Sequence, residues 1–531
     1  MKMKRIFQLS VASLVLVMAS CIGDLDVVPK DPNLVTGKTV YDSPEAYKQG
    51  LAKLYALFIL TGQQGPAGQP DVAGVDEGFS CFTRSMWNLE ELTTDEAIWS
   101  YPNDAEGTIS NLYFNSWLPS DGIPTALFGR LMASMVIINE YIRAVGDSND
   151  PDLVRYRAEA RFLRALGYYY GMNLYGNMPV VTEADLPGAF LPQQKSRAEI
   201  FQYVDEELLA IYDDLGSPKF EYGRADKAAA SMLLAKLYLN AAVFLEGAED
   251  IPPQYAGRNF YNDVITELNK VFEGGYSLAP KYLNNFLADN HTSPEIIFSF
   301  NNDGAKSQAY DGVWVMIRGN AGNGGWNGLR TRSAFVSLFD DSPNDYRDFF
   351  AAEDKEQERE ITEPNNPKHG YGVYKFRNVK SDGTTPANDA TGFVDTDFPL
   401  FRLADAYLMY AEAVVRGATN GSTATAVGYI NALRNRSGEL DEDENPISIG
   451  NITAGELDLD FILDERGREL YWEGHRRTDL IRFGKYTGST YIWDWKGGTQ
   501  EGRSIPEHLK IFPIPAADLA TNPTLVQNPG Y

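Results

Sequence analysis

Between Glu465 and Tyr486 the sequence ERGRELYWEGHRRTDLIRFGKY places carboxylates, arginines and a histidine among large apolar residues. A carboxylate beside a histidine is a combination that hydrolases use to move protons. His475, however, lies among arginines, which favour its neutral form, and no nucleophile stands beside it. Wound as one helix, the segment gathers small and apolar residues on one stripe: Leu463, Gly467, Leu470, Gly474 and Ile481. This pattern predicts a scaffold helix rather than an active site.

The charges of this predicted helix have partners within it. Glu473 precedes Arg476 and Arg477 by three and four residues. Glu465 precedes Arg468 by three, so ion pairs along the helix are available. The two interior glycines cost about 1 kcal/mol each relative to alanine. They therefore predict that another helix packs closely against the stripe.

A second group of acids, Glu90, Glu91, Asp95 and Glu96, could supply the two carboxyls of a glycosidase. Acid-rich stretches are common in this chain, which has 73 acids against 47 lysines and arginines, so their proximity in sequence means little. The four histidines are scattered without HExxH spacing, and there is no GxSxG, P-loop or CxxC motif. We therefore predict no catalytic residue and no enzyme.

Composition limits the partners. The net charge of −26 repels nucleic acid phosphates and anionic lipid, and suits a neutral ligand or a cation better. The chain also contains 8 Trp and 30 Tyr. Most of these aromatics are expected to pack between helices. Some could stack on a flat ligand, because Trp and Tyr combine an apolar face with a polar edge.

The N-terminus has the pattern of a secretory signal peptide at 1–20. Basic residues precede an apolar run from Ile6 to Met18, and two small residues lead to Cys21. This arrangement resembles a bacterial lipobox and predicts lipidation of Cys21, although Met18 stands where Leu or Val is more common. An ordinary signal with a coincidental cysteine is the alternative. The only other cysteine is Cys81, and no later stretch has 18 uninterrupted apolar residues, so the lipid is the expected membrane attachment.

Helical periodicity dominates the rest of the chain, after a polar tether at 22–39. Small and large apolar residues recur three or four apart in several segments, many of them bounded by glycine or proline. The predicted helices are 43–60, 151–176, 197–215, 224–244, 259–275, 398–416, 424–438 and the segment from Glu465 to Tyr486. Alternating helices with Ala-rich faces predict a mainly α fold of stacked, tetratricopeptide-like helical hairpins. Residues 276–395 lack helical period, and 511–531 reads as an extended tail.

The landmarks SCIGDLDVVPKDP, RAEARFLRALGYYYGMNLYGNMPV, LFRLADAYLMYAEAV, YINALRNRSG, the opening segment and IFPIPAADLATNPTLVQNPGY resemble those of the SusD/RagB family, in the same order. The match covers Cys21 to Tyr531. It implies an N-terminal helical region (21–275) and a C-terminal region (276–531) with a loop-rich insertion (276–395). It also implies a surface-exposed outer-membrane lipoprotein that serves glycan uptake with a SusC-like TonB-dependent transporter.

Two irregular regions, 76–107 and 322–330, are where a ligand site is expected, because loops on a helical frame often carry binding residues. Trp99 lies in the first region and Trp326, flanked by glycines, lies in the second. A sugar ring would stack its C–H face on such rings. The resemblance supports these two positions best, with loop-core packing as the alternative for each. Core packing is the favoured interpretation of Trp87.

Polar partners for the sugar hydroxyls are expected from Asp76, Arg84 and Asn103. A third stacking aromatic is implied by the resemblance, and Tyr310 and Phe300 are both candidates. Which glycan would bind is left open.

Two alternatives remain. The chain could be a transporter lid or assembly scaffold with little glycan affinity of its own. The acid clusters at 395–397 and 441–445 could hold a structural calcium ion, but they lack the EF-hand pattern and more plausibly form a solvated surface. No cofactor or metal is expected to be required.

Overall fold

The computed structural model describes residues 40–531 except for short gaps. The gaps are 63–69, 101–107, 187, 189–190, 249–250, 320–327, 343, 351–356, 389–390 and 439–446. The chain divides into two compact units, Met1–Tyr47 and Lys48–Tyr531. In the described part of the first unit, Tyr41 and Tyr47 stack with ring centroids 5.2 Å apart. The predicted signal peptide, Cys21 and the tether lie outside the described residues.

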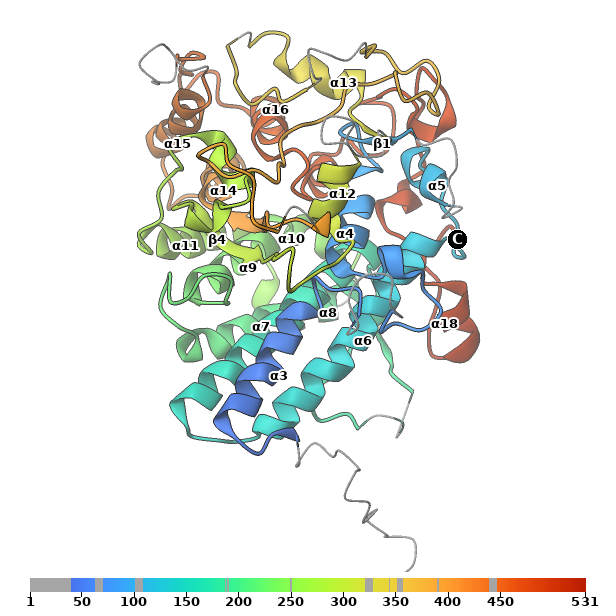
Figure 1. The fold of residues 1–531 in the computed structure, drawn as a ribbon, viewed down its shortest axis with the longest axis vertical. Helices are drawn as coiled ribbons and strands as arrows, with labels where there is room; N and C mark the ends of the chain where they lie inside the picture. Colours follow the sequence, from blue (N-terminus) through green and yellow to red (C-terminus); the bar gives the residue numbers. More distant parts are fainter. Residues whose placement is uncertain are drawn as a thin grey trace, which may run out of the picture. The chain divides into compact units, whose positions relative to one another are not determined.

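Long helices pack side by side through the second unit (Figure 1). Their order of contact is α6 with α7, α7 with α8, α9 with α11, α11 with α14, and α14 with α15 and α16. Their bounds are α6 Gly122–Val145, α7 Pro151–Tyr175, α8 Arg197–Ile211, α9 Lys227–Leu239, α11 Phe260–Phe272, α14 Leu403–Val415, α15 Thr423–Arg436 and α16 Leu459–Leu470. Neighbouring helices that bury one another's faces in series are the mark of a helical-repeat scaffold. The predicted mainly α, tetratricopeptide-like fold is confirmed.

Local capping explains where several of these helices begin. The Asp150 carboxylate accepts from the backbone N–H of Asp152 at 2.9 Å, and proline occupies the first position of α7. Ser196 and Glu199 form a capping box at the start of α8. The predictions at 151–176 and 197–215 are thereby confirmed. Those at 43–60, 224–244, 259–275 and 424–438 are confirmed with shorter ends, as α3 Pro44–Ala56, α9, α11 and α15.

Helix α6 was not predicted. It is the one helix in the described part of the chain that is long and apolar enough to cross a membrane, but 61% of its most apolar window is buried inside the protein. It packs against α7 and α4. A hydrophobic helix enclosed in this way is a core element.

Residues 276–395 contain only short elements, as their lack of helical period predicts. These are η4 Tyr282–Phe286, η5 Asn290–Thr292, β4 Ile296–Phe300, α12 Gly312–Arg318, β5 Leu329–Arg330, α13 Ser333–Val336 and η7 Ser337–Phe339. The described strands form three two-stranded antiparallel sheets: β1 Ile98–Trp99 with β5, β2 Met178–Pro179 with β3 Gln194–Lys195, and β4 with β6 Phe398–Arg402. The boundary expected at 275 lies within the second unit.

The predicted helix at 398–416 is wrong in its first five residues. They form strand β6, fully buried and paired with β4, and α14 begins only at Leu403. Pro399 disfavours a helical conformation at Phe398, which was an available local signal. Pairing with β4 and burial explain why residues 398–402 form a strand.

The predicted single helix over 465–486 is also wrong. Helix α16 ends at Leu470, and α17 spans only Arg476–Arg482. Between them Trp472 and Gly474 have φ of 63° and 76°, in the left-handed region. The stripe therefore ends where the chain turns.

The remaining described elements are short. They are η1 Glu77–Phe79, α4 Phe82–Glu91, α5 Ile109–Tyr113, η2 Tyr212–Asp214, α10 Ala241–Phe244, η3 Pro253–Tyr255, η9 Lys496–Gly498, η10 Glu507–Lys510 and α18 Ala516–Thr521. The tail at 511–531 contains α18 but is otherwise extended. Phe512 is fully buried, and its N–H donates to Leu174 at 2.7 Å, so the tail is bonded to the end of α7.

Candidate functional site

The described ends of the two predicted loop regions are joined by the β1–β5 ladder. Trp99 pairs with Leu329, and the Ser100 N–H donates to the Gly328 carbonyl at 2.6 Å. The Ser100 hydroxyl donates to the same carbonyl at 2.9 Å. Ser100 and Gly328 directly adjoin residues 101–107 and 320–327, which lie outside the described residues. Two segments far apart in sequence, one ending at Ser100 and one beginning at Gly328, therefore meet at one place on the scaffold.

Trp99 is 7% exposed within this ladder. Its small exposed part is compatible with a ring edge at the surface, and its burial is compatible with loop-core packing. Asn103 and Trp326 lie outside the described residues, so their roles remain predictions.

The first predicted loop region, 76–107, contains a helix. Every residue of α4 is buried, and α4 lies beside α12 (Figure 1). The expectation of an irregular binding loop is wrong for this part. Core packing of Trp87 is confirmed: it is fully buried, and its indole N–H donates to the Trp472 carbonyl at 3.2 Å. Helical spacing could have revealed α4, through Phe82, Met86 and Leu89.

Asp76 and Arg84 meet at Gly78 but differ in exposure. Asp76 is exposed and caps η1, accepting from the Gly78 N–H at 2.7 Å. Arg84, in α4, is 3% exposed, and its guanidinium donates to the Gly78 carbonyl. Asp76 is thus open to solvent, whereas the buried Arg84 side chain stabilises the turn through its hydrogen bond to Gly78.

Tyr310 belongs to an aromatic cluster at the start of α12. Its ring meets Trp314 edge to face with centroids 4.8 Å apart and lies 5.5 Å from the Phe393 ring. Tyr310 and Phe393 are both half-buried, while Trp314 is 8% exposed. At the other end of α12, Gly319 accepts from the Leu329 N–H at 3.0 Å. Helix α12 thus links the Tyr310 cluster to the sheet that carries Trp99.

The four acids considered for a glycosidase are buried, and two of them, Glu91 and Glu96, bind the turn between α16 and α17. Glu96 accepts from the Trp472 N–H at 2.8 Å, and Glu91 accepts from the Gly474 N–H at 2.6 Å. Burial raises the pKa of Glu96 to about 7 and that of Glu91 well above its usual range, and the charge of Glu96 raises the pKa of Glu91 further. Two buried carboxyls with raised pKa values therefore accept the backbone N–H groups where the helix breaks.

The other two acids of this group make separate scaffold contacts. Glu90 accepts from Asn173 at 2.8 Å, and burial raises its pKa to about 7. Burial also acts on Asp95, but its pair with Arg476, at 2.7 Å, outweighs that effect and lowers its pKa. Both are fully buried.

The ion pairs predicted within the opening segment are partly confirmed. Arg468 binds Glu465 at 2.9 Å, as predicted. Glu473 instead binds Lys375 and Arg402, both at 2.6 Å and all three buried, so that part is wrong. The turn after α16 carries Glu473 away from the arginines that follow it. Burial, and then the Lys236 ammonium, lower the pKa of His475 well below its ordinary value, which agrees with the expected neutral form.

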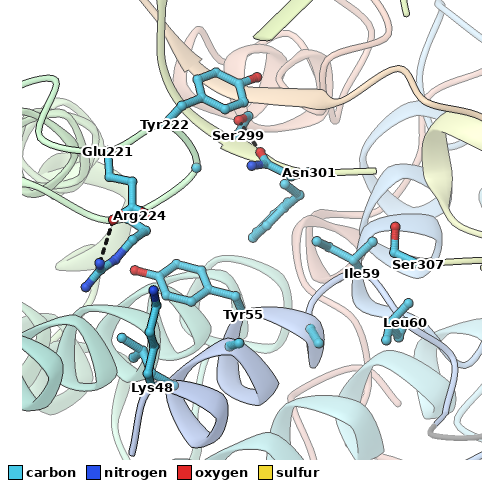
Figure 2. A pocket seen from close by; sticks show the side chains of 15 residues that line it. Lys48, Tyr55, Ile59, Leu60, Glu221, Tyr222, Arg224, Ser299, Asn301 and Ser307 are labelled. Atoms are coloured by element: carbon cyan, nitrogen blue, oxygen red, sulfur yellow. Dashed lines mark hydrogen bonds and ion pairs between the residues drawn. The ribbon is translucent and has the colours of Figure 1, made fainter. Parts of the chain in front are cut away.

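A cavity of about 320 Å³ lies between residues 48–60, 221–224 and 299–307, all in the second unit (Figure 2). Phe300, the alternative third aromatic, is 1% exposed and forms part of its wall, stacked on Phe58 with centroids 5.5 Å apart. None of the other predicted glycan-binding residues in the described part of the chain lines it. The apolar wall residues are Leu51, Ala52, Ala56, Ile59, Leu60 and Phe300.

The acids at 395–397 serve as acceptors for the scaffold. Asp395 accepts from the Gly304 N–H at 3.1 Å, and Asp397 accepts from the Asn302 N–H at 2.7 Å. Within the described residues no group of three or more His, Cys, Asp or Glu side chains is placed to hold a metal ion. The acids at 441–445 lie outside the description.

Comparisons with known proteins agree with this architecture. The sequence profile of the SusD family matches residues 362–531. The starch-binding protein SusD of Bacteroides thetaiotaomicron is 34% identical, over 100% of both chains. SusD-like protein P25 of Formosa agariphila is 26% identical over 70% of this chain and 73% of its own. This chain therefore belongs to the SusD family.

Solved structures share the fold. A SusD superfamily protein from Bacteroides thetaiotaomicron matches with a TM-score of 0.70 and 19% identity, over 91% of this chain and 99% of that one. Surface glycan-binding protein A from the same organism, solved in complex with laminarihexaose, matches with a TM-score of 0.67 and 18% identity, over 91% and 99%.

Proposed function

We propose that this protein captures an oligosaccharide or polysaccharide at the cell surface by aromatic stacking and passes it to a SusC-like TonB-dependent transporter. It acts by binding rather than catalysis, and the lipid on Cys21 anchors it to the outer membrane. Trp99 and Trp326 stack on the sugar rings, with Tyr310 as the third aromatic. Asp76 and Asn103 hydrogen-bond the hydroxyls, and Arg84, predicted as a third polar partner, instead supports the turn at Gly78 beside Asp76.

The β1–β5 ladder is the observation that carries this proposal. It brings the inner ends of the two predicted loop regions together, and α12 connects it to the half-buried Tyr310 ring. Membership in the SusD family, with a full-length relative named as starch-binding, supports a glycan as the ligand. Stacking on each aromatic is worth about 0.5–1.5 kcal/mol, so affinity in the micromolar to millimolar range is expected.

The alternative is a transporter lid with little glycan affinity. The 7% exposure of Trp99 favours it, because a ring buried that deeply has little face to offer.

Isothermal titration against a panel of neutral oligosaccharides tests the proposal. The protein is the chain from residue 21 with Cys21→Ala, and the variant adds Trp99→Ala and Trp326→Ala. Loss of two stacks should weaken binding roughly 5- to 150-fold. Phe220→Ala removes a 37% exposed aromatic outside the site and should leave binding unchanged.

Thermal unfolding of each variant separates lost stacking from lost folding, since Trp99 is mostly buried. If the folded parent protein binds no glycan in a broad panel, the result favours the transporter-lid alternative. Glycan uptake by cells that carry the double variant would then be the deciding measurement.

A further inference from the structure

The cavity in Figure 2 has walls that are held in place. The Tyr55 hydroxyl donates to Glu159 at 2.7 Å and accepts from the Ala225 N–H at 2.8 Å. Arg224 binds the same Glu159 carboxylate at 3.0 Å and pairs with Glu221 at 2.7 Å. Because these side chains are already bonded to one another, they frame the cavity and do not need a ligand to order them.

Aromatic surfaces face this space. The Tyr222 hydroxyl donates to Asp397 at 2.8 Å, which fixes the ring while the residue remains 37% exposed. Tyr55 and Phe300 add two further rings to the lining. A lining that is mainly apolar and contains fixed rings suits a flat, apolar ligand body.

Two hydrogen-bond donors in the cavity lining remain without a partner among the described residues: the Asn301 amide N–H group and the Lys48 ammonium. The Ser299 hydroxyl donates to the Asn301 side-chain carbonyl at 2.6 Å, which orients the amide. The Asn301 Nδ2 atom and the Lys48 ammonium lie on opposite sides of the cavity in Figure 2. Neither has a hydrogen bond or ion pair with another described residue.

Gly223 leaves room for the Asn301 amide in this position. Its φ is +76°, and a Cβ added there would lie 2.0 Å from Asn301 Nδ2. Any other residue would displace the amide, so the local chain is built around it.

We propose that this cavity is a second ligand site, which binds a small aromatic carboxylate. The ring lies against Tyr55, Tyr222 and Phe300, the carboxylate accepts from Lys48, and Asn301, on the opposite side, donates to a polar group at the other end of the ligand. Arg224 is shared by Glu159 and Glu221, so the Lys48 ammonium is the lining cation that has no ion pair with another described residue, and the ligand carboxylate would pair with it. The site does not depend on the proposed glycan-binding residues.

Ligand titration tests the proposal. The protein is the chain from residue 21 with Cys21→Ala, and the two ligands are 4-hydroxycinnamate and its uncharged amide. The acid should bind saturably and at least roughly tenfold more tightly than the amide, as a charge-assisted hydrogen bond requires. Lys48→Met should remove that preference. Lys53→Met is the control. It removes one positive charge from the same helix, where Lys53 pairs with Asp71 at 3.5 Å, and it should leave the preference for the acid unchanged.

Ala52→Trp gives a second, independent variant. Ala52 is an exposed wall residue, so the indole fills the cavity without disturbing the core, and binding should be lost. The Trp99→Ala/Trp326→Ala variant should bind the acid normally, which separates this site from the glycan face. Equal affinity for acid and amide, no binding of either, or binding that survives Ala52→Trp would overturn the proposal.

Discussion

At the level of single residues, two buried acids hold the turn after α16: Glu91, the last residue of α4, and Glu96, which follows that helix. Glu91 and Glu96 accept the N–H groups of Gly474 and Trp472, which have no helical partner because the helix ends there. Burial disfavours the ionised form of both carboxyls and raises their pKa values. These raised pKa values make the stability of the protein depend on pH.

The direction of that dependence follows from the pKa shifts. The pKa of Glu96 is raised from 4.5 to about 7 on folding, so its contribution is complete below the unfolded value and is lost as pH rises through 7. The pKa of Glu469 is held near 2: burial opposes this, but Arg436 and Arg402 outweigh it. That contribution is present above the unfolded value and is lost in acid. The melting temperature should therefore be highest near pH 5.

Glu96→Gln should raise the melting temperature at pH 8 but not at pH 5. The amide keeps an acceptor for the Trp472 N–H and removes the charge, a gain on the order of 2 kcal/mol at pH 8. Differential scanning calorimetry at the two pH values measures it. Glu465→Gln is the control: Glu465 binds Arg347, so that variant should lose stability at both. A Glu96→Gln effect that is equal at both pH values would contradict the raised pKa of Glu96.

At the level of elements, the break between α16 and α17 determines where the charges of 465–482 point. With the break, Glu473 reaches Lys375 and Arg402, and Arg476 reaches Asp95. Buried pairs of this kind are costly to disrupt singly, because the remaining charge has no partner. The turn is therefore a structural requirement of the core.

Gly474→Ala should destabilise the protein by about 1–2 kcal/mol, because φ of +76° is unfavourable for alanine. The added Cβ would also lie 3.0 Å from the Met86 sulfur. Gly428→Ala is a matched change inside α15, where nothing lies within 4 Å of the new Cβ, and it should stabilise by up to about 1 kcal/mol. Urea unfolding distinguishes the two signs. Similar effects for both would show that the turn carries no special constraint.

At the level of the whole molecule, we expect the location of the protein to depend on Cys21. We expect cells that express the protein to incorporate labelled palmitate into it and to carry it in the outer-membrane fraction. Cys21→Ala should abolish both, because a protein of net charge −26 has little attraction of its own for an anionic membrane surface. Cys81→Ser is the matched control, since Cys81 is fully buried. Labelling that persists in Cys21→Ala would refute lipidation at that residue.

The sequence by itself determined the helical scaffold. Caps and apolar spacing act within one helix, so α7, α8, α11 and α15 could be predicted near their true bounds. The order of the landmarks indicated the family. Among the candidate site residues, the irregular region 76–107 and the family resemblance indicated Trp99, and the third aromatic was left open between Tyr310 and Phe300.

Tertiary structure alone decided the elements that the sequence did not predict, because the interactions that stabilise them join residues far apart in the chain. The burial of α4, the strand at 398–402 and the turn at 471–475 each depend on a distant partner: α12, β4, and the pair of Glu91 and Glu96. Polar side chains in α4 suggest a surface until those partners are known. The cavity beside Tyr222 is likewise formed by three segments, and no local pattern in any one of them indicates it.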